Sequence, residues 1–175
     1  MFIFGHIGIG RKLVRPWSRR LPAVALIAGM LLPDLIDKPL YYLRISDFFS
    51  CTRTVGHTGL FLVTIVTVAY FARSSALAAL GSGVATHLGL DLLLDLFGKD
   101  PQRASWIAFT WPFLNRNFAY TFIPSIASHL ERLWVTPVIA AELVGLALIA
   151  WDYWSWTRRR NRAVAGSTKA PFSQP

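Results

Sequence analysis

The order of apolar and polar positions along the chain predicts a helical membrane protein. Four apolar stretches come near the length that a helix needs to cross a bilayer, which is about 20 residues with a range of roughly 17 to 25. The first two are short, and they can span only if flanking side chains snorkel or the helices pack inside a thicker protein interior. We therefore predict an all-α, multipass membrane bundle of about four transmembrane helices, covering residues 21–36, 58–72, 76–97 and 133–154.

A shorter apolar segment and the tryptophans complete this pattern. Residues 105–114 (SWIAFTWPFL) are too few to cross a bilayer and predict an interfacial or re-entrant segment. Tryptophan favours the interface between membrane and water. All seven tryptophans fall near the ends of predicted spans, as an aromatic belt requires: Trp17, Trp106, Trp111, Trp134, Trp151, Trp154 and Trp156.

The composition agrees with a membrane environment. Apolar residues make up 54% of the chain and charged residues only 15%, whereas about 25% charged is typical of soluble domains. The net charge of +9 comes largely from two basic blocks, residues 11–20 and 158–162, each beside an apolar stretch. Such blocks typically face anionic headgroups, so they favour membrane lipids over nucleic acid as partners. The single cysteine, Cys51, cannot form a disulfide within the chain.

The distribution of Lys and Arg predicts the orientation. Four crossings put both termini on one side, together with the turn at residues 73–75. That side carries eleven Lys and Arg residues and the opposite side seven, so the positive-inside rule predicts cytoplasmic termini in a protein of the cell (inner or plasma) membrane. We assign residues 1–156 to one membrane-embedded helical domain and residues 157–175 to a basic, disordered tail.

Three titratable side chains interrupt the third apolar stretch. His87 and Asp91 are four residues apart, so a helix places them on one face, one turn from each other, which is a usual way to present two metal ligands. Asp95 lies one turn further, just before a predicted helix end at Gly98. There it opposes the helix dipole, and we interpret it as a structural residue compensated by Lys99.

A second set of titratable side chains lies where the first apolar stretch ends and the second begins. Pro33 can open a new helical turn, in a short segment that ends at Pro39. This turn puts Asp34 and Asp37 on a common face, and two carboxylates this close repel each other unless a cation lies between them. His57 stands at the mouth of the second span, at the same predicted membrane face.

Carboxylate and imidazole donors of this kind suit Zn²⁺ or Mn²⁺, as one ion or several. The alternative is that no metal binds and each polar side chain is paired with its own neighbours. Each histidine would then form a hydrogen bond within the packed helices, and the aspartates would cap a helix. Three of the four histidines lie beside glycine or aspartate in these polar groups, which favours the metal site over the alternative. The fourth, His129, is interpreted as an interfacial side chain. Glu142, in the middle of the fourth stretch, must be protonated, paired or part of the site.

Six short motifs follow one another between residue 5 and about residue 135: GHIGIG, LLPDLIDKPL, TRTVGHTGLF, GVATHLGLDLL, FTWPF and HLERLW. The order of these motifs resembles the order found in the predicted membrane-bound metal-dependent hydrolases, the DUF457 (YdjM-like) family. That family often reads PDxDH and HRGxTHS in two of these motifs. Here two residues separate the aspartates, and Thr52 stands in place of the first histidine, so the chain looks like a variant branch with fewer ligands or a different metal count.

The resemblance implies a fold, a reaction and a ligand set. The family is grouped with the zinc-dependent phospholipase C and P1 nuclease proteins, which implies an all-helical fold and hydrolysis of phosphoesters. By the same resemblance, the ligands of one or more divalent ions would be His6, Asp34, Asp37, His57, His87 and Asp91.

We therefore expect a membrane-bound metal-dependent hydrolase that acts on a phosphoester of a lipid or lipid-linked substrate, with water activated by zinc or manganese. Asp34 or Asp37, where not fully engaged with metal, would act as general base. Arg53 would hold a phosphate through its planar guanidinium, or else face the lipid headgroups.

Two other functions fit the same residues. A small transporter or ion pathway would relay protons or cations through His87, Asp91 and Glu142. A noncatalytic membrane scaffold would use the metal only to join its helices. The position of His6 leaves the topology open. With cytoplasmic termini, His6 reaches a site at the opposite face only if residues 1–10 dip into the bundle; otherwise the site lies near the midplane or the orientation is inverted.

Overall fold

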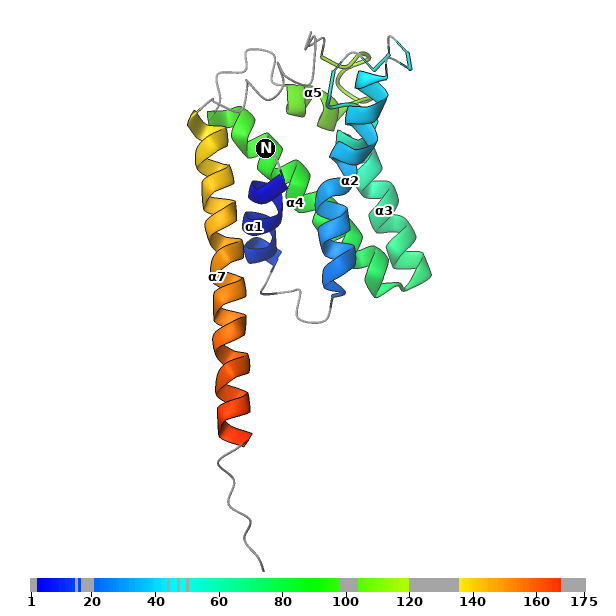
Figure 1. The fold of residues 1–175 in the computed structure, drawn as a ribbon. Coiled ribbons are helices and arrows are strands. Elements are labelled where there is room, and N and C mark those ends of the chain that lie inside the picture. The colour runs from blue at the N-terminus through cyan, green and yellow to red at the C-terminus, as the bar shows by residue number, and fades with distance from the viewer. Residues whose placement is uncertain are drawn as a thin grey trace, which may run out of the picture.

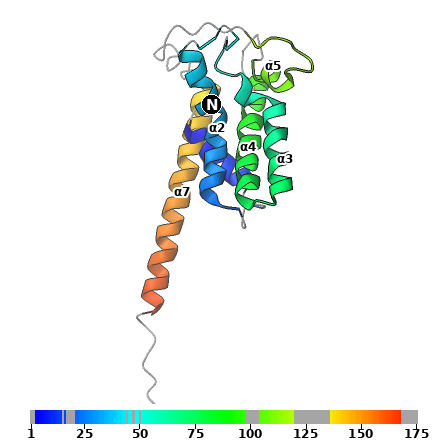
Figure 2. The same cartoon turned by 90° about the vertical axis from the view of Figure 1, so that its right-hand side faces the viewer.

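The computed structural model of the protein is all-α, with six α-helices among the residues that it describes. These residues are 3–14, 16, 21–43, 45, 46, 48, 49, 51–97, 104–119 and 136–167. The helices form a bundle from which one long helix, α7 (Thr136–Ser167), extends at one end (Figures 1 and 2). Lys99 and His129 lie outside the described residues, so their predicted roles stay predictions.

All four predicted apolar stretches form helices, which confirms the all-α fold class. Among the described residues, only α4 (Ser75–Phe97) and α7 are long and apolar enough to cross a membrane by length and composition, and α3 (Gly59–Ala72) is apolar but shorter. The number of four spans therefore stays a prediction. The four stretches correspond to α2 (Ala23–Tyr42), α3 (Gly59–Ala72), α4 (Ser75–Phe97) and α7 (Thr136–Ser167).

Two helices run further than the sequence pattern suggests. α2 continues through Pro33 and Pro39, so the expectation of a separate short segment between these prolines is wrong. Each proline removes one backbone donor, but the extensive packing of α2 against α4 keeps the helix continuous. α7 continues to Ser167, so the first part of the predicted tail is helical.

Three short elements complete the bundle around these helices. α1 (Ile3–Val14) packs against α7, α4 and α2, and it runs in the opposite direction to α2 (Figure 1). A short 3-10 helix, η2 (Val55–His57), leads into α3. α5 (Ala104–Thr110) forms the first part of the predicted interfacial segment and lies near the end of the bundle where α2 finishes (Figure 1).

Glycines allow the helices to approach closely. A Cβ atom on Gly83 of α4 would lie 2.2 Å from the carbonyl oxygen of Leu26 in α2. A Cβ atom on Gly8 of α1 would lie 2.1 Å from the carbonyl oxygen of Gly145 in α7. Both distances are far below van der Waals contact, so a larger residue would push the backbones apart. Small residues at such contacts are typical of helix pairs in membranes.

Large apolar side chains cover the outer surfaces of α3 and α7. On α3, Val63, Tyr70 and Phe71 are each 60% exposed or more, and on α7 the same holds for Leu143. Water-soluble proteins rarely expose continuous apolar faces of this kind. Such exposed apolar side chains are typical of surfaces that contact lipid or another protein.

Candidate metal centre

Four separate segments bring histidines and aspartates together inside the bundle. α1 packs against α7, α4 and α2 and runs in the opposite direction to α2 (Figure 1), and His6 near its start lies 3.5 Å from Asp91 of α4. The structure therefore has the N-terminal segment inside the bundle, which is one of the three possibilities left open for His6. The residues brought together are His6 of α1, Asp34 and Asp37 of α2, His57 of η2, and His87 and Asp91 of α4.

Asp37 fixes the orientation of the His57 ring. Its carboxylate accepts hydrogen bonds from the backbone N–H groups of Thr54 (2.6 Å) and Gly56 (2.9 Å) and lies 2.7 Å from His57 Nδ1. A Cβ atom on Gly56 would lie 2.9 Å from the carbonyl oxygen of Pro33, so glycine lets η2 come close to α2. Because an ionised carboxylate can only accept, His57 Nδ1 donates, and in the neutral ring Nε2 carries the lone pair.

A backbone carbonyl orients the His87 ring in the same way, through its Nδ1 atom. His87 Nδ1 lies 2.7 Å from the carbonyl oxygen of Met30 in α2. A carbonyl oxygen can only accept, so His87 Nδ1 donates and His87 Nε2 carries the lone pair. Both tautomers thus follow from the partners of the Nδ1 atoms.

The two rings consequently direct lone pairs at each other. His57 Nε2 and His87 Nε2 are 3.1 Å apart, and both residues are 1% exposed. Two acceptor atoms at this distance repel each other unless a cation, either a proton or a metal ion, joins them. Histidines that ligate a metal typically donate their other N–H to a carboxylate or a backbone carbonyl, as both rings do here.

His6 and Asp91 complete the buried part of the cluster. His6 Nε2 lies 3.5 Å from Asp91 Oδ1, and its ring stacks on that of His87 with 3.8 Å between the ring centroids. Asp91 Oδ2 lies 3.7 Å from His57 Nε2 and 4.0 Å from His87 Nε2. The carboxylate of Asp91 therefore faces all three imidazole rings.

Asp34 stands at the more open side of the cluster. Its Oδ1 lies 3.7 Å from His57 Nε2, and its Oδ2 accepts a hydrogen bond from Lys38 Nζ at 2.6 Å. The side chain is 20% exposed, whereas that of Asp91 is 4% exposed and that of Asp37 is fully buried. Asp34 therefore connects the buried histidines with the surface.

The donor atoms of these side chains have the spacing of a metal site. They lie within 4.8 Å of one another in two overlapping sets, His6 with His87 and Asp91, and Asp34 with His57 and His87. Ligand atoms placed tetrahedrally around zinc at bond lengths of about 2.0–2.1 Å are about 3.3 Å apart. Small side-chain movements would bring either set to that spacing, so the cluster could hold a metal ion.

Arg53 binds two aspartates of α4. Its Nε lies 3.0 Å from Asp91 Oδ2, and a terminal nitrogen lies 3.8 Å from Asp95 Oδ1. Burial disfavours the charge of Arg53, but the two carboxylates outweigh it and raise the pKa of the guanidinium above its usual value. Arg53, predicted to hold a phosphate, thus contacts a cluster carboxylate while its side chain stays 24% exposed.

Asp95 joins α4 to α5. Its Oδ2 accepts a hydrogen bond from the backbone N–H of Ser105 at 2.9 Å, and its other oxygen faces Arg53. These contacts agree with a structural role, with Arg53 as a compensating cation. This arrangement could not be predicted from the sequence, because the residues that pair with Asp95 are distant in sequence.

Glu142 holds the first turn of α1. Its two carboxylate oxygens accept hydrogen bonds from the backbone N–H groups of Phe4 (3.0 Å) and Gly5 (3.2 Å). The N–H groups of a first helical turn have no partner within the helix and favour a negative charge. Through this contact α7 fixes the helix that carries His6 into the cluster.

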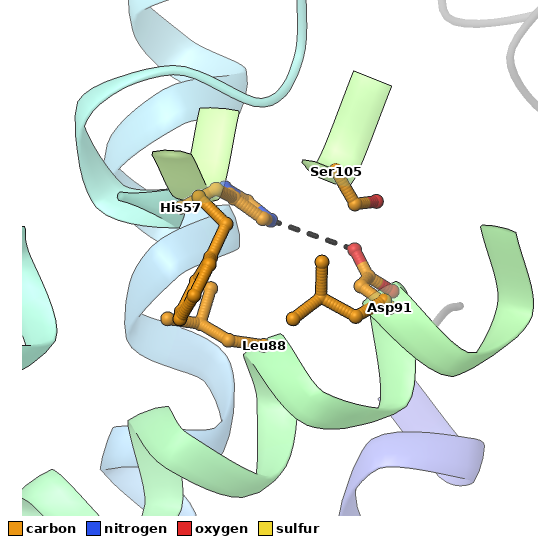
Figure 3. Close-up of a pocket in the computed structure, with 6 residues that line it drawn as sticks. His57, Leu88, Asp91 and Ser105 are labelled. Carbon is orange, nitrogen blue, oxygen red and sulfur yellow. Dashed lines mark ion pairs between the residues drawn. The ribbon is translucent and has the colours of Figure 1, made fainter. Parts of the chain in front are cut away.

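A small pocket adjoins the cluster where α4, α5 and η2 meet. Figure 3 shows His57 and Asp91 facing each other across it, with Ser105 above the Asp91 carboxylate. Ser105 was not predicted from the sequence, since no spacing relates it to the histidines and aspartates of the cluster. The pocket is lined by His57, Leu88, Asp91, Leu92, Ser105 and Phe109.

No family model, no curated protein and no solved structure matches the chain. The resemblance of its motifs to the DUF457 family therefore stays a hypothesis. Function has to be argued from the geometry and chemistry of the cluster itself.

Proposed function

We propose that this protein is a membrane-bound metal-dependent hydrolase that acts on a phosphoester. The observation that carries the proposal is the 3.1 Å separation of His57 Nε2 and His87 Nε2, at which neither neutral ring has a hydrogen to donate. A divalent cation bound by both rings would remove their repulsion. The carboxylate of Asp91 lies close enough to balance part of its charge.

The roles within the cluster follow from the contacts of each side chain. Asp37 would position His57 instead of binding the cation, because both of its oxygens already accept hydrogen bonds. Zn²⁺ or Mn²⁺ bound here would supply Lewis acidity, which makes water acidic enough to react as a nucleophile at neutral pH. The cation would be held by His6, Asp34, His57, His87 and Asp91, whose donor atoms lie near one another.

Asp34 and Arg53 would take part in the reaction. Asp34 is the most exposed carboxylate of the cluster, so the oxygen that it does not use to bind the cation can receive a proton from water as a general base. Arg53 presents a planar guanidinium that can form paired hydrogen bonds with phosphate oxygens. To do so it would exchange part of its contact with Asp91 for the substrate.

The surface of the molecule supports a lipid or lipid-linked substrate in the cell membrane. The exposed apolar faces of α3 and α7 suit the hydrocarbon region. Asp34 and Asp37 lie in the second half of α2, which finishes at the end of the bundle where α5 lies (Figure 1), so a substrate with an apolar tail would reach the cluster with its headgroup at the membrane surface.

Metal analysis of the purified protein tests the proposal. We expect at least one divalent ion for each wild-type chain and loss of most of it in His57→Ala and in Asp91→Ala, because each variant removes a donor. Asp152→Asn is the matched control, since this carboxylate pairs with Lys12 at the far end of α1. Full metal content in both cluster variants would refute the metal centre.

The same preparations separate the three candidate functions when assayed with phosphodiester and phosphomonoester substrates. Turnover that requires the metal supports the hydrolase. Metal without turnover supports the scaffold. Ion flux in liposomes by a metal-free protein supports the transporter, and Glu142→Gln should then impair flux as much as Asp91→Asn does.

A further inference from the structure

Ser105 is a polar residue of the pocket that the proposed ligand set does not explain. It is 3% exposed and lines the pocket together with His57 and Asp91. Within the part of the chain that the structure describes, its hydroxyl has no hydrogen-bond partner. A buried polar group left without a partner costs about 1–3 kcal/mol, so a hydroxyl at this place indicates a ligand that completes it.

The position of Ser105 is fixed by the neighbours of the metal cluster. Its backbone N–H donates to Asp95 Oδ2 at 2.9 Å, and Asp95 also contacts Arg53. Arg53 in turn donates to Asp91. The hydroxyl of Ser105 and the guanidinium of Arg53 are therefore two hydrogen-bond donors held near the same carboxylate, as Figure 3 illustrates for Ser105.

The rest of the pocket is apolar. Its apolar walls are formed by Leu88, Leu92 and Phe109. The space between these side chains is too narrow for a water molecule in this structure. A ligand must therefore part the apolar side chains as it enters. Apart from Ser105, the polar side chains that line the pocket are His57 and Asp91, which belong to the cluster.

We propose that the Ser105 hydroxyl donates a hydrogen bond to a non-bridging oxygen of a phosphoryl group bound at the metal centre. The inference rests on the proposed function and names a substrate-binding residue for it. Hydroxyl and guanidinium donors next to a bound cation suit the negative oxygens of a phosphoryl group. The apolar walls suit the hydrocarbon part of the same substrate.

Binding of inorganic phosphate to the metal-loaded, full-length protein in detergent tests this role without any need for turnover. Calorimetry should show that Ser105→Ala weakens phosphate binding about 10- to 100-fold, the range for one lost hydrogen bond to a charged group. Metal content should stay unchanged. Ser105→Thr keeps the hydroxyl and should bind phosphate more tightly than Ser105→Ala.

Ser82→Ala is the matched control, because the Ser82 hydroxyl donates to the carbonyl oxygen of Ala78 in its own helix. This variant should bind phosphate as the wild type does. Equal phosphate affinity in Ser105→Ala and the wild type, or loss of metal in Ser105→Ala, would overturn the role of Ser105 alone. A wild-type protein that binds no metal would overturn the proposed function as well.

Discussion

At the scale of single residues, the geometry of the cluster depends on the hydrogen bonds of the histidine Nδ1 atoms as well as on the histidines themselves. Asp37 and the carbonyl group of Met30 fix the two Nδ1 atoms as donors, and this choice leaves both Nε2 atoms as acceptors. A metal site depends on such orienting contacts, because they set the tautomer and direction of each ligand.

Asp37→Asn should lower the affinity for divalent metal about 10- to 100-fold, the usual effect of removing a group that orients a ligand. The amide keeps the size of the side chain but removes the charge that three donors now share. Competition with a metal-binding dye measures the affinity. Asp152→Asn serves as control, and wild-type affinity in Asp37→Asn would contradict the positioning role.

Part of this residue-scale arrangement could be predicted from the sequence. His87 and Asp91 are one helical turn apart, so their common face follows from helix geometry. The contact of Asp37 with His57 could not be derived in this way, because it depends on the path of the chain through η2 and on two backbone N–H groups. Ser105 likewise depends on how α5 folds back onto α4.

At the scale of elements, the distance between α2 and α4 decides whether ligands from both helices can meet. The hydrogen bond from His87 to Met30 crosses this interface, as does the contact of Gly83 with Leu26. Any residue that separates the two helices would therefore also separate Asp34 from His87.

Gly83→Ala should destabilise the protein by about 1–3 kcal/mol, the range for an overpacked core, because the new methyl group would lie 2.2 Å from the carbonyl oxygen of Leu26. Gly89→Ala is the control in the same helix, since its methyl group would meet nothing within 4 Å. There alanine should be neutral or stabilising by up to about 1 kcal/mol. Unfolding free energies measured in detergent test the pair, and equal destabilisation would contradict the packing argument.

Hydropathy located the longer elements well and the shorter ones less well. The predicted stretches at residues 58–72 and 76–97 match α3 and α4 closely, because apolar composition persists over their length. α1 was not assigned as a helix of the bundle, since its apolar run is short and a basic block follows it. Its place depends on packing against α7, including the hydrogen bonds to Glu142.

At the scale of the whole molecule, three basic segments lie away from the end of the bundle at which α2 finishes, whereas Lys38 and Arg53 contact the histidine and aspartate cluster itself. The last turn of α1, with Arg11 and Lys12, the turn at Arg73 and the second half of α7 all lie away from α5 and the C-terminal end of α2 (Figure 1). With cytoplasmic termini, the cluster would thus lie toward the outer side of the membrane.

A reporter that is active only in the cytoplasm, fused to the C-terminus, should therefore be active in the wild type. Replacing four arginines with glutamine leaves equal numbers of basic residues on the two predicted sides, so reporter activity should fall. Arg116→Gln, on the opposite predicted side, is the control and should not lower it. An inactive wild-type fusion would show that the orientation is opposite to the predicted one. The four replaced residues are Arg158, Arg159, Arg160 and Arg162.

The contact of Glu142 with the first turn of α1 sets the order in which the molecule can be completed during synthesis. His6 leaves the ribosome well before Glu142, yet the carboxylate of Glu142 fastens the helix that carries His6. A chain stalled before α7 would have the other residues of the cluster but no anchor for His6. Under the proposed function, such a chain should therefore bind divalent metal less tightly than a chain that includes α7.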